Sequence, residues 1–237
     1  MCSFMRSVTT LCLICFLIVP AIAFGRDVSV TPDEALQKLL DGNKQYSQSK
    51  HSKEYHSDSY HPTSTALSSK PYAIIVTCSD FPVPSELLFN KRSGEIIEIR
   101  VAGNVPDYNV IRLIGYLVER LNVSLIMVLG HEKCEAMSAI VKAKGRSTER
   151  ADFDAISTIL FQDPAAVAKK CAACKNEVNC ADIKNKAFME CYISDYTKSV
   201  PPYLMKRSAR LKKLVTDNKL AIVAAEYQDN DTVKIIK

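Results

Sequence analysis

The chain has 237 residues and a formal net charge of +5, which is enough for one compact domain of ordinary size plus a leader segment. Hydrophobic residues make up 47% of the chain and charged residues 24%, both typical of a soluble globular protein. Because acidic and basic residues are interspersed, no concentrated basic patch indicates a nucleic-acid partner, and we expect no binding to nucleic acid.

The N-terminus has the pattern of a signal peptide. Arg6 precedes a short apolar stretch at residues 11–19, and Ala21-Ile22-Ala23 has the small-x-small form of a cleavage site. The stretch is short for a membrane span, and an uncleaved anchor is the alternative. We therefore expect a signal peptide over residues 1–23, an exported protein that is periplasmic or secreted, and no membrane association after cleavage. Removing Arg6 would leave a mature charge of about +4.

Residues 24–70 are predicted to form an N-terminal helical arm and a polar connector. Thr31 suits the N-cap of a helix and Pro32 its first turn, and Gly42 is expected to end this helix as a C-cap. The apolar face of the helix consists of Ala35, Leu36, Leu39 and Leu40. The polar stretch 47–69 is expected to be a solvated connector. Its three histidines are spaced by five residues and do not share a helix face, so we expect no metal site there; they are His51, His56 and His61.

Residues 71–237 alternate strands with helices. The strands are predicted at 72–77, 95–101, 125–130, 220–227 and, at the edge of the sheet, 233–236. The helices are predicted at 85–90, 111–122, 132–144 and about 209–215, with a largely helical lobe at about 145–200. Pro201-Pro202 is expected to break the chain before the last helix. This alternation predicts an α/β fold with a mainly parallel four- to five-stranded sheet flanked by helices.

Two of the predicted strands end in side chains that bind metals. The first is followed by Cys78-Ser79-Asp80, and the third by His131-Glu132-Lys133-Cys134. Ligands collect at the carboxyl ends of parallel strands, and two cysteines with one histidine form a ligand set for catalytic zinc. A lone cysteine at a strand end is usually a small buried hydrophobe, but the two motifs together favour a metal site.

Three motifs resemble those of one enzyme family. They are Cys78-Ser79-Asp80 followed by Val83-Pro84-Ser85-Glu86-Leu87-Leu88-Phe89, then Arg100-Val101-Ala102-Gly103-Asn104, then Gly130-His131-Glu132-Lys133-Cys134-Glu135-Ala136-Met137. They are similar to the first metal motif, the Arg-Asn-Ala-Gly-Asn turn and the second metal motif of the β-class carbonic anhydrases. The stretch from Glu34 to Tyr46 also resembles the N-terminal arm of bacterial members, which packs on a neighbouring subunit.

The resemblance carries a set of expectations. It implies a β-carbonic anhydrase-like fold and one Zn(2+) per chain, bound by Cys78, His131 and Cys134. It implies reversible hydration of carbon dioxide to bicarbonate and a proton through a zinc-bound hydroxide, which is a carbonate dehydratase activity. It also implies a homodimer or higher homo-oligomer. The substrate pocket would be formed by Val83, Arg100, Gly103 and Asn104.

The first motif departs from the family pattern at one position. The family has Cys-x-Asp-x-Arg, whereas this chain has Pro82 in place of the arginine that pairs with the aspartate. Asp80 then has two conceivable roles: orienting the hydroxide, or binding zinc as a fourth ligand that closes the site. Without its arginine, the carboxylate gains reason to bind the metal, so we expect the closed form. Arg100 is the available substitute partner, and Glu135, in place of a family glycine, is expected to be a solvated acid of a first helical turn.

Two alternatives to an active carbonic anhydrase remain open. Pro82 favours a zinc-binding relative whose hydration activity is weak or lost. The same metal chemistry would also serve a hydrolase of a related small molecule such as carbon disulfide, and the sequence does not separate that activity from hydration.

Six cysteines remain after the leader is removed, and four of them are not assigned to zinc. Those four are Cys171, Cys174, Cys180 and Cys191. In an oxidising compartment, spare thiols tend to pair, so we expect two disulfides with three possible connectivities. The alternative is a second zinc held by four thiolates, because Cys171-Ala172-Ala173-Cys174 has the spacing of a zinc finger.

Overall fold

The computed structural model describes residues 30–50, 70–143, 163–174 and 180–237. The predicted signal peptide at 1–23 and the three histidines of the polar connector lie outside the described residues. Among the residues described, no helix is both long and apolar enough to cross a membrane.

A five-stranded sheet forms the centre of the molecule. Its strands are β1 (Ala73–Thr77), β2 (Ile96–Arg100), β3 (Leu125–His131), β4 (Ala221–Tyr227) and β5 (Val233–Ile236), in the spatial order β2-β1-β3-β4-β5. The first four strands are parallel, and β5 pairs antiparallel with β4 at the edge. Every residue of β1 and β3 is buried, which is typical of central strands covered on both faces. The predicted fold class is confirmed.

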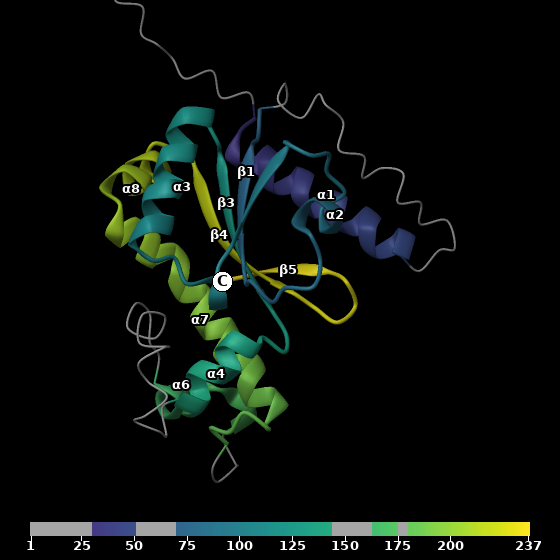
Figure 1. Ribbon diagram of the computed structural model, residues 1–237, viewed down its shortest axis with the longest axis vertical. Coiled ribbons are helices and arrows are strands. Elements are labelled where there is room, and N and C mark those ends of the chain that lie inside the picture. The colour runs from purple at the N-terminus through teal and green to yellow at the C-terminus, as the bar shows by residue number, and fades with distance from the viewer. Residues whose placement is uncertain (1–29, 51–69, 144–162, 175–179) are drawn as a thin grey trace, which may run out of the picture.

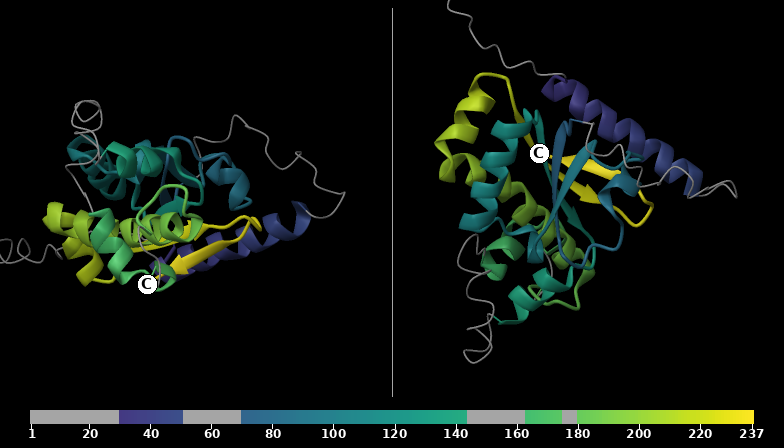
Figure 2. Two further views of the ribbon diagram at one scale, coloured as in Figure 1. Left: turned by 90° about the horizontal axis from the view of Figure 1, so that it is seen from below. Right: turned by 45° about the horizontal axis from the view of Figure 1, so that its top comes forward.

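Helices cover both faces of this sheet. They are α1 (Pro32–Lys50), α2 (Ser85–Leu88), the 3-10 turn η3 (Ala102–Asn104), α3 (Tyr108–Leu121), α4 (Glu135–Ala143), α6 (Pro164–Lys170), the 3-10 turn η4 (Ala172–Cys174), α7 (Lys186–Arg207) and α8 (Ala209–Thr216). Figures 1 and 2 show α1 and α2 on one side of the strands and α3 and α8 on the other, with α4 and α6 beyond one end of the sheet. Two separate apolar cores result, one on each face.

The N-terminal helix is longer than predicted. Its start is correct, because the Thr31 hydroxyl accepts from the Glu34 N–H and the Glu34 carboxylate accepts from the Thr31 N–H. Gly42, however, is not a C-cap, and α1 continues through it to Lys50. A Cβ at position 42 would overlap the carbonyl oxygen of Phe89, so the glycine permits close packing of α1 on α2. The buried face of α1 packs on the sheet of its own chain.

The prediction that Pro201-Pro202 breaks the chain is wrong. Both prolines lie inside α7, a helix of 22 residues. Proline removes a helical hydrogen bond and normally interrupts a helix. Here the residues on both sides of the pair are anchored in the core, including Val200 and Leu204, neither of which has exposed surface. Packing of the helix therefore outweighs the local preference.

The four cysteines of the C-terminal half form two disulfides, Cys171–Cys191 and Cys174–Cys180. We call residues 163–174 and 180–191, which include α6, η4 and the first turns of α7, the disulfide lobe. The predicted pairing is confirmed and its connectivity is fixed. The alternative of a second zinc is wrong, because all four sulfurs are used in disulfide bonds.

Candidate metal centre

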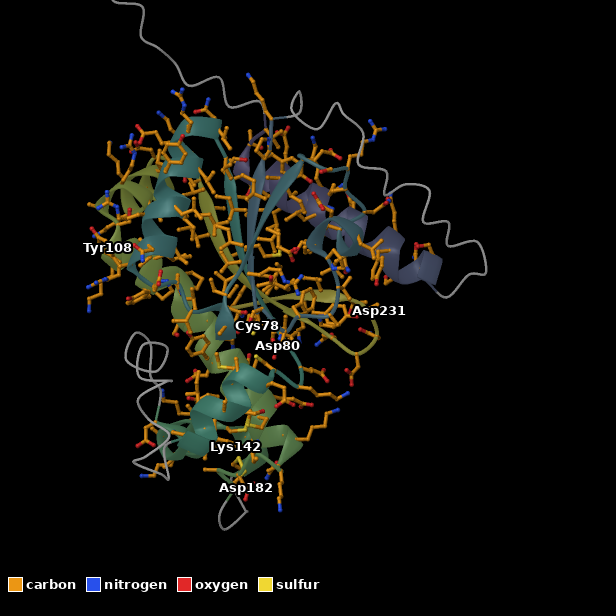
Figure 3. The ribbon with its side chains drawn as sticks, viewed as in Figure 1. Cys78, Asp80, Tyr108, Lys142, Asp182 and Asp231 are labelled. Carbon is orange, nitrogen blue, oxygen red and sulfur yellow. A yellow bond between two sulfur atoms is a disulfide. The ribbon has the colours of Figure 1, made fainter. Side chains whose placement is uncertain are left out.

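The two predicted metal motifs meet at the carboxyl edge of the sheet. Cys78 directly follows β1, and His131 is the last residue of β3. The two strands are parallel neighbours, with Thr77 in register with Leu129. The side chains that follow them are therefore delivered to the same place. Figure 3 shows Cys78 and Asp80 where the sheet meets the segment that carries α4.

Four side chains converge there. The potential ligand atoms of Cys78, Asp80, His131 and Cys134 all lie within 4.8 Å of one another. The two sulfurs are 3.5 Å apart, and Asp80 Oδ1 lies 3.0 Å from His131 Nε2 and 3.8 Å from Cys134 Sγ. Both cysteines are free thiols and buried, so both sulfurs are available as ligands.

The turn between His131 and Cys134 makes this convergence possible. Lys133 has a φ of 58°, a left-handed conformation that is uncommon for a residue with a side chain. It separates the end of β3 from α4, which consequently begins at Glu135 and not at the predicted Glu132. The sharp turn brings the imidazole and the second thiol to one side of the loop.

The backbone prepares two of these side chains for a metal. His131 Nδ1 lies 2.9 Å from the carbonyl oxygen of Glu132, which assigns the ring proton to Nδ1 and leaves Nε2 facing the cluster as a ligand. The Gly103 N–H donates to Cys78 Sγ at 3.0 Å. A sulfur that accepts a backbone hydrogen bond is prepared to carry negative charge.

The pKa values of the two cysteines move in opposite directions. The hydrogen bond from Cys134 lowers the pKa of Cys78 to about 5. Its closeness to Cys78, together with burial, raises the pKa of Cys134 far above the ordinary range. Deprotonation of the second thiol is therefore unfavourable unless a positive charge lies beside it, and a bound metal would supply that charge. Burial lowers the pKa of His131, but Cys78 and Asp80 outweigh this effect and raise it.

Asp80 is held in the cluster by the first residue of α4. Its Oδ2 accepts from the backbone N–H of Glu135 at 2.8 Å, at the N-terminus of α4, where an anion is favoured. Burial would raise the pKa of Asp80, but hydrogen bonds from Cys78 and from this N–H, together with His131, outweigh it and lower the pKa. The carboxylate is thus ionised and fixed beside His131. The Glu135 side chain is exposed, as predicted.

The donor set fits zinc in chemistry and in spacing. Two sulfurs, one imidazole nitrogen and one carboxylate oxygen are ligands that tetrahedral zinc accepts. Its ordinary bond lengths place two sulfurs about 3.8 Å apart, and a nitrogen and an oxygen about 3.3 Å apart. The observed separations, 3.5 Å and 3.0 Å, are slightly shorter, so a small outward movement of these atoms would accommodate zinc.

Comparisons with known proteins agree with this site. A family profile described as carbonic anhydrase matches residues 73–233. The chain belongs to the β-class carbonic anhydrase family. It is 27% identical over 213 residues to carbonic anhydrase 2 of Mycobacterium tuberculosis, covering 88% of this chain and 94% of that protein. It is 34% identical over 114 residues to a carbonic anhydrase of Mycolicibacterium smegmatis, covering 47% of this chain and 54% of that protein.

Solved structures of β-carbonic anhydrases share the fold. One of two tetrameric enzymes from Sordaria macrospora superimposes with a TM-score of 0.58 at 17% identity, covering 85% of this chain and 96% of that one. The Coccomyxa enzyme, solved with acetazolamide, gives a TM-score of 0.56 at 21% identity, covering 85% of this chain and 86% of that one.

The residues expected to line a substrate pocket lie in different surroundings. Gly103 contacts the centre through its N–H, and Asn104 beside it is buried with a side-chain oxygen that has no hydrogen-bond partner among the described residues. Val83 is buried in the core on the α1 side of the sheet. Arg100 donates to the Phe81 carbonyl and pairs with Glu98 at 3.4 Å. In the described part of the chain, Arg100 therefore does not take over the pairing with Asp80 that the family arginine would make.

Several contacts of the β-carbonic anhydrase motifs could not be predicted from the sequence. The ring of Phe81 packs against His131 with centroids 5.4 Å apart, and against Tyr227 with centroids 5.2 Å apart. An aromatic residue directly after Cys-Ser-Asp is the only signal that could have indicated this contact. On the other side, Thr197 of α7 lies against Gly130, the residue before His131. No local pattern indicates that contact, because the two residues come from distant parts of the sequence.

Proposed function

We propose that this protein is a zinc-dependent carbonic anhydrase that catalyses the reversible hydration of carbon dioxide to bicarbonate and a proton. The observation that carries the proposal is the convergence of four donors, whose ligand atoms lie within 4.8 Å of one another. They are Cys78, Asp80, His131 and Cys134. The relatives described above are named carbonic anhydrases, which supports the same reaction.

The protein side chains would hold one zinc ion per chain. Cys78, His131 and Cys134 are the three firm ligands in this proposal. Bound zinc supplies a Lewis acid that lowers the pKa of a coordinated water towards neutrality. The Gly103 N–H holds the Cys78 sulfur, and the Glu132 carbonyl holds the His131 ring. Backbone groups therefore orient both ligands.

Asp80 would be the fourth ligand in the resting protein, which closes the site. Its Oδ1 already stands 3.0 Å from His131 Nε2, and its Oδ2 is held by the Glu135 N–H. Activity requires Asp80 to leave the metal and find another partner. Pro82 cannot be that partner, and Arg100 is engaged with Phe81 and Glu98. We therefore expect low activity until Arg100 exchanges its partners.

The substrate would approach beside the Ala102–Asn104 turn. In this proposal, Gly103 and Asn104 border the substrate next to Cys78, while Val83 and Arg100 form a more distant wall. A small neutral molecule such as carbon dioxide needs little room and few polar contacts. The unpartnered side-chain oxygen of Asn104 is the one buried polar atom of this turn that could orient a substrate or its water.

The protein would be exported and oligomeric. The N-terminal pattern over residues 1–23 and the two disulfides support export to an oxidising compartment. N-terminal sequencing of the protein recovered after expression with its leader should begin at Phe24.

Large apolar side chains are exposed on α3: Tyr108 and Tyr116 at 61% and Leu113 at 44%. Their exposure supports burial of that face in a homodimer or higher oligomer.

Stopped-flow carbon dioxide hydration tests this function, with zinc quantified on the same sample of mature protein. We expect about one zinc per chain and a hydration rate that rises with pH. Full zinc without hydration at any pH would contradict the proposal and favour the impaired relative that Pro82 suggests. A Pro82→Arg variant that gains activity would then show that the missing arginine is the cause.

A further inference from the structure

Phe81 is a buried aromatic residue that touches the metal centre without offering it a ligand. It directly follows Asp80, and only 2% of its surface is exposed. Its ring packs against the imidazole of His131, with centroids 5.4 Å apart and planes inclined by 51°, which is within the range of a favourable aromatic contact. A residue of the first metal motif therefore packs directly on a ligand of the second.

The backbone of Phe81 closes a tight turn. Its N–H donates to the carbonyl of Cys78 at 3.1 Å, which is the four-residue pattern of a β-turn. Two further hydrogen bonds tie this turn to the end of β2. Arg100 donates to the Phe81 carbonyl, and the Ser79 N–H donates to the Val101 carbonyl at 3.2 Å. The two metal donors of the turn therefore stand on an anchored backbone.

A second aromatic ring lies behind Phe81. Tyr227 of β4 is in register with His131 of β3, so both side chains leave the sheet on the same face. Phe81 packs edge-on against the Tyr227 ring, with centroids 5.2 Å apart and planes inclined by 78°. The Tyr227 hydroxyl donates to Asp231 in the turn before β5. Movement of the Phe81 ring away from His131 would therefore disturb a packed pair of rings.

The hydrogen bonds of His131 leave one motion of its ring weakly restrained. Nδ1 lies 2.9 Å from the Glu132 carbonyl oxygen, and Nε2 lies 3.0 Å from Asp80 Oδ1. Both interactions act at ring nitrogens, so the ring can still tilt about the line that joins these two atoms. A flat apolar ring packed against the imidazole limits that tilt. Metal ligands must keep their orientation within about 10–20° to bind well.

We propose that Phe81 is a positioning residue of the metal centre. Its ring sets the plane of the His131 imidazole, and its backbone holds the turn that carries Cys78 and Asp80. One residue thereby keeps three of the four donors in a fixed arrangement. The inference rests on the metal centre of the proposed function but not on the reaction.

The chain offers a matched control at Phe89. This residue has no exposed surface and belongs to the same apolar core as Phe81. It lies at the C-terminal end of α2, where its backbone meets Gly42 of α1. Phe81→Leu and Phe89→Leu therefore make the same exchange in the same core, one beside the imidazole and the other against α1.

The experiment compares both variants with the parent protein, using zinc and cobalt as probes. Zinc affinity is measured by competition with a chromophoric chelator, and the visible absorption of the cobalt-substituted proteins is recorded. We expect Phe81→Leu to weaken zinc binding about 10-fold, the lower end of the range for loss of an outer contact to a ligand. Its cobalt bands should lose intensity, because a tilted imidazole distorts the tetrahedral site and admits water as an additional ligand.

A pair of variants at Tyr227 tests the same inference if Phe81→Leu does not fold. Tyr227→Leu removes the ring behind Phe81 and should weaken zinc binding in the same direction by a smaller factor. Tyr227→Phe keeps that ring and loses only the hydrogen bond to Asp231, so it should match the parent protein. A Tyr227→Leu protein with the zinc affinity and cobalt spectrum of the parent would overturn the inference. Equal losses in the two Tyr227 variants would do so as well, because the hydroxyl would then be responsible.

Phe89→Leu should match the parent protein in both metal measurements, even where its melting temperature falls as far as that of Phe81→Leu. Unchanged zinc affinity and an unchanged cobalt spectrum for Phe81→Leu would overturn the inference while leaving the metal centre intact. An equal loss of affinity in Phe89→Leu would also overturn it, because the cause would then be a general loosening of the core. A parent protein that binds neither zinc nor cobalt would overturn the metal centre itself, and the inference with it.

Discussion

The protein contains two groups of cysteines that differ in their spacing, in their oxidation state and in their neighbours. Cys78 and Cys134 are 56 positions apart, come from the ends of two parallel strands and remain free thiols 3.5 Å apart. The four cysteines of the disulfide lobe lie within 21 positions and are all oxidised. The difference lies in their neighbours. A histidine and a carboxylate accompany the first group, whereas each sulfur of the second group is bonded to another sulfur of that group.

This contrast shows that the position of a cysteine in the fold decides whether it stays a free thiol or forms a disulfide. The sheet fixes Cys78 and Cys134 with a cation-binding set around them, so one bound metal can stabilise both thiolates. The described residues of the disulfide lobe form no strand, and covalent links hold its short elements α6 and η4 to the start of α7. The contrast predicts that each group can be disabled without the other.

The largest effect is expected from a change of one metal ligand. Cys134→Ser should abolish stoichiometric zinc binding and lower hydration more than about 100-fold, beyond the range for outer contacts of a ligand. Metal analysis and stopped-flow hydration measure the two effects. The control is the double variant Cys174→Ala and Cys180→Ala, which should keep its zinc. If Cys134→Ser retains one zinc and full activity, Cys134 is not a ligand.

Removal of the metal should destabilise the protein without opening the disulfides. At a free zinc concentration 1,000 times the Kd, bound zinc would add about 4 kcal/mol to the free energy of unfolding. Chemical denaturation of the zinc-loaded and the chelated protein measures this difference, and thiol counting should find both disulfides intact. Zinc affinity should fall as pH falls, because protons compete for the thiolates, and Cys134 holds its proton firmly. Equal unfolding curves with and without zinc would contradict the account.

Loss of a disulfide should destabilise the lobe and spare the metal centre. Removing Cys171–Cys191, which spans 20 positions, should lower the free energy of unfolding by about 3 kcal/mol in the chain-entropy description. Removing Cys174–Cys180, which spans six positions, should cost about 2 kcal/mol because its loop is shorter. Paired Cys→Ala variants and denaturant unfolding test this order. Loss of zinc in either variant would show that the two cysteine groups depend on one another.

The smallest effect is expected where β3 contacts α7, the helix that carries Cys191. Gly130→Ala would place a Cβ 2.5 Å from Thr197 Oγ1, so β3 and α7 must separate slightly, at a cost of about 1–3 kcal/mol. Zinc affinity should fall as well, because His131 follows directly. The control is Gly115→Ala on α3, where a Cβ would meet nothing within 4 Å, and where alanine should stabilise the helix by up to about 1 kcal/mol. If Gly130→Ala is as stable as the parent, α7 does not constrain β3.

The sequence was sufficient to predict the sheet, the meeting of the two metal motifs at its edge, and two disulfides among the spare cysteines, although it left three connectivities open. Those features depend on short patterns: apolar runs of β-branched residues, metal-binding side chains directly after them, and an even number of clustered cysteines. The local predictions at Gly42 and Pro201 were wrong because packing of α1 on α2 and of α7 on the core outweighs glycine and proline preferences.

The surroundings of the metal centre could not be predicted in the same way. Phe81 packs against His131, and Thr197 of α7 lies against Gly130 of β3, through contacts between residues distant in the sequence. The sequence indicated Arg100 as the substitute partner of Asp80, but Arg100 contacts the Phe81 carbonyl and Glu98 instead, and no local pattern distinguishes these partners.

A crystal structure of the zinc-loaded mature protein, with anomalous data at the zinc edge, tests the central claim most directly. The account predicts one anomalous peak among Cys78, His131 and Cys134, with Asp80 bound to the metal as the fourth ligand and Arg100 still on the Phe81 carbonyl. A peak elsewhere would contradict the metal centre. Water in the fourth position, with Asp80 paired to Arg100, would contradict the closed site.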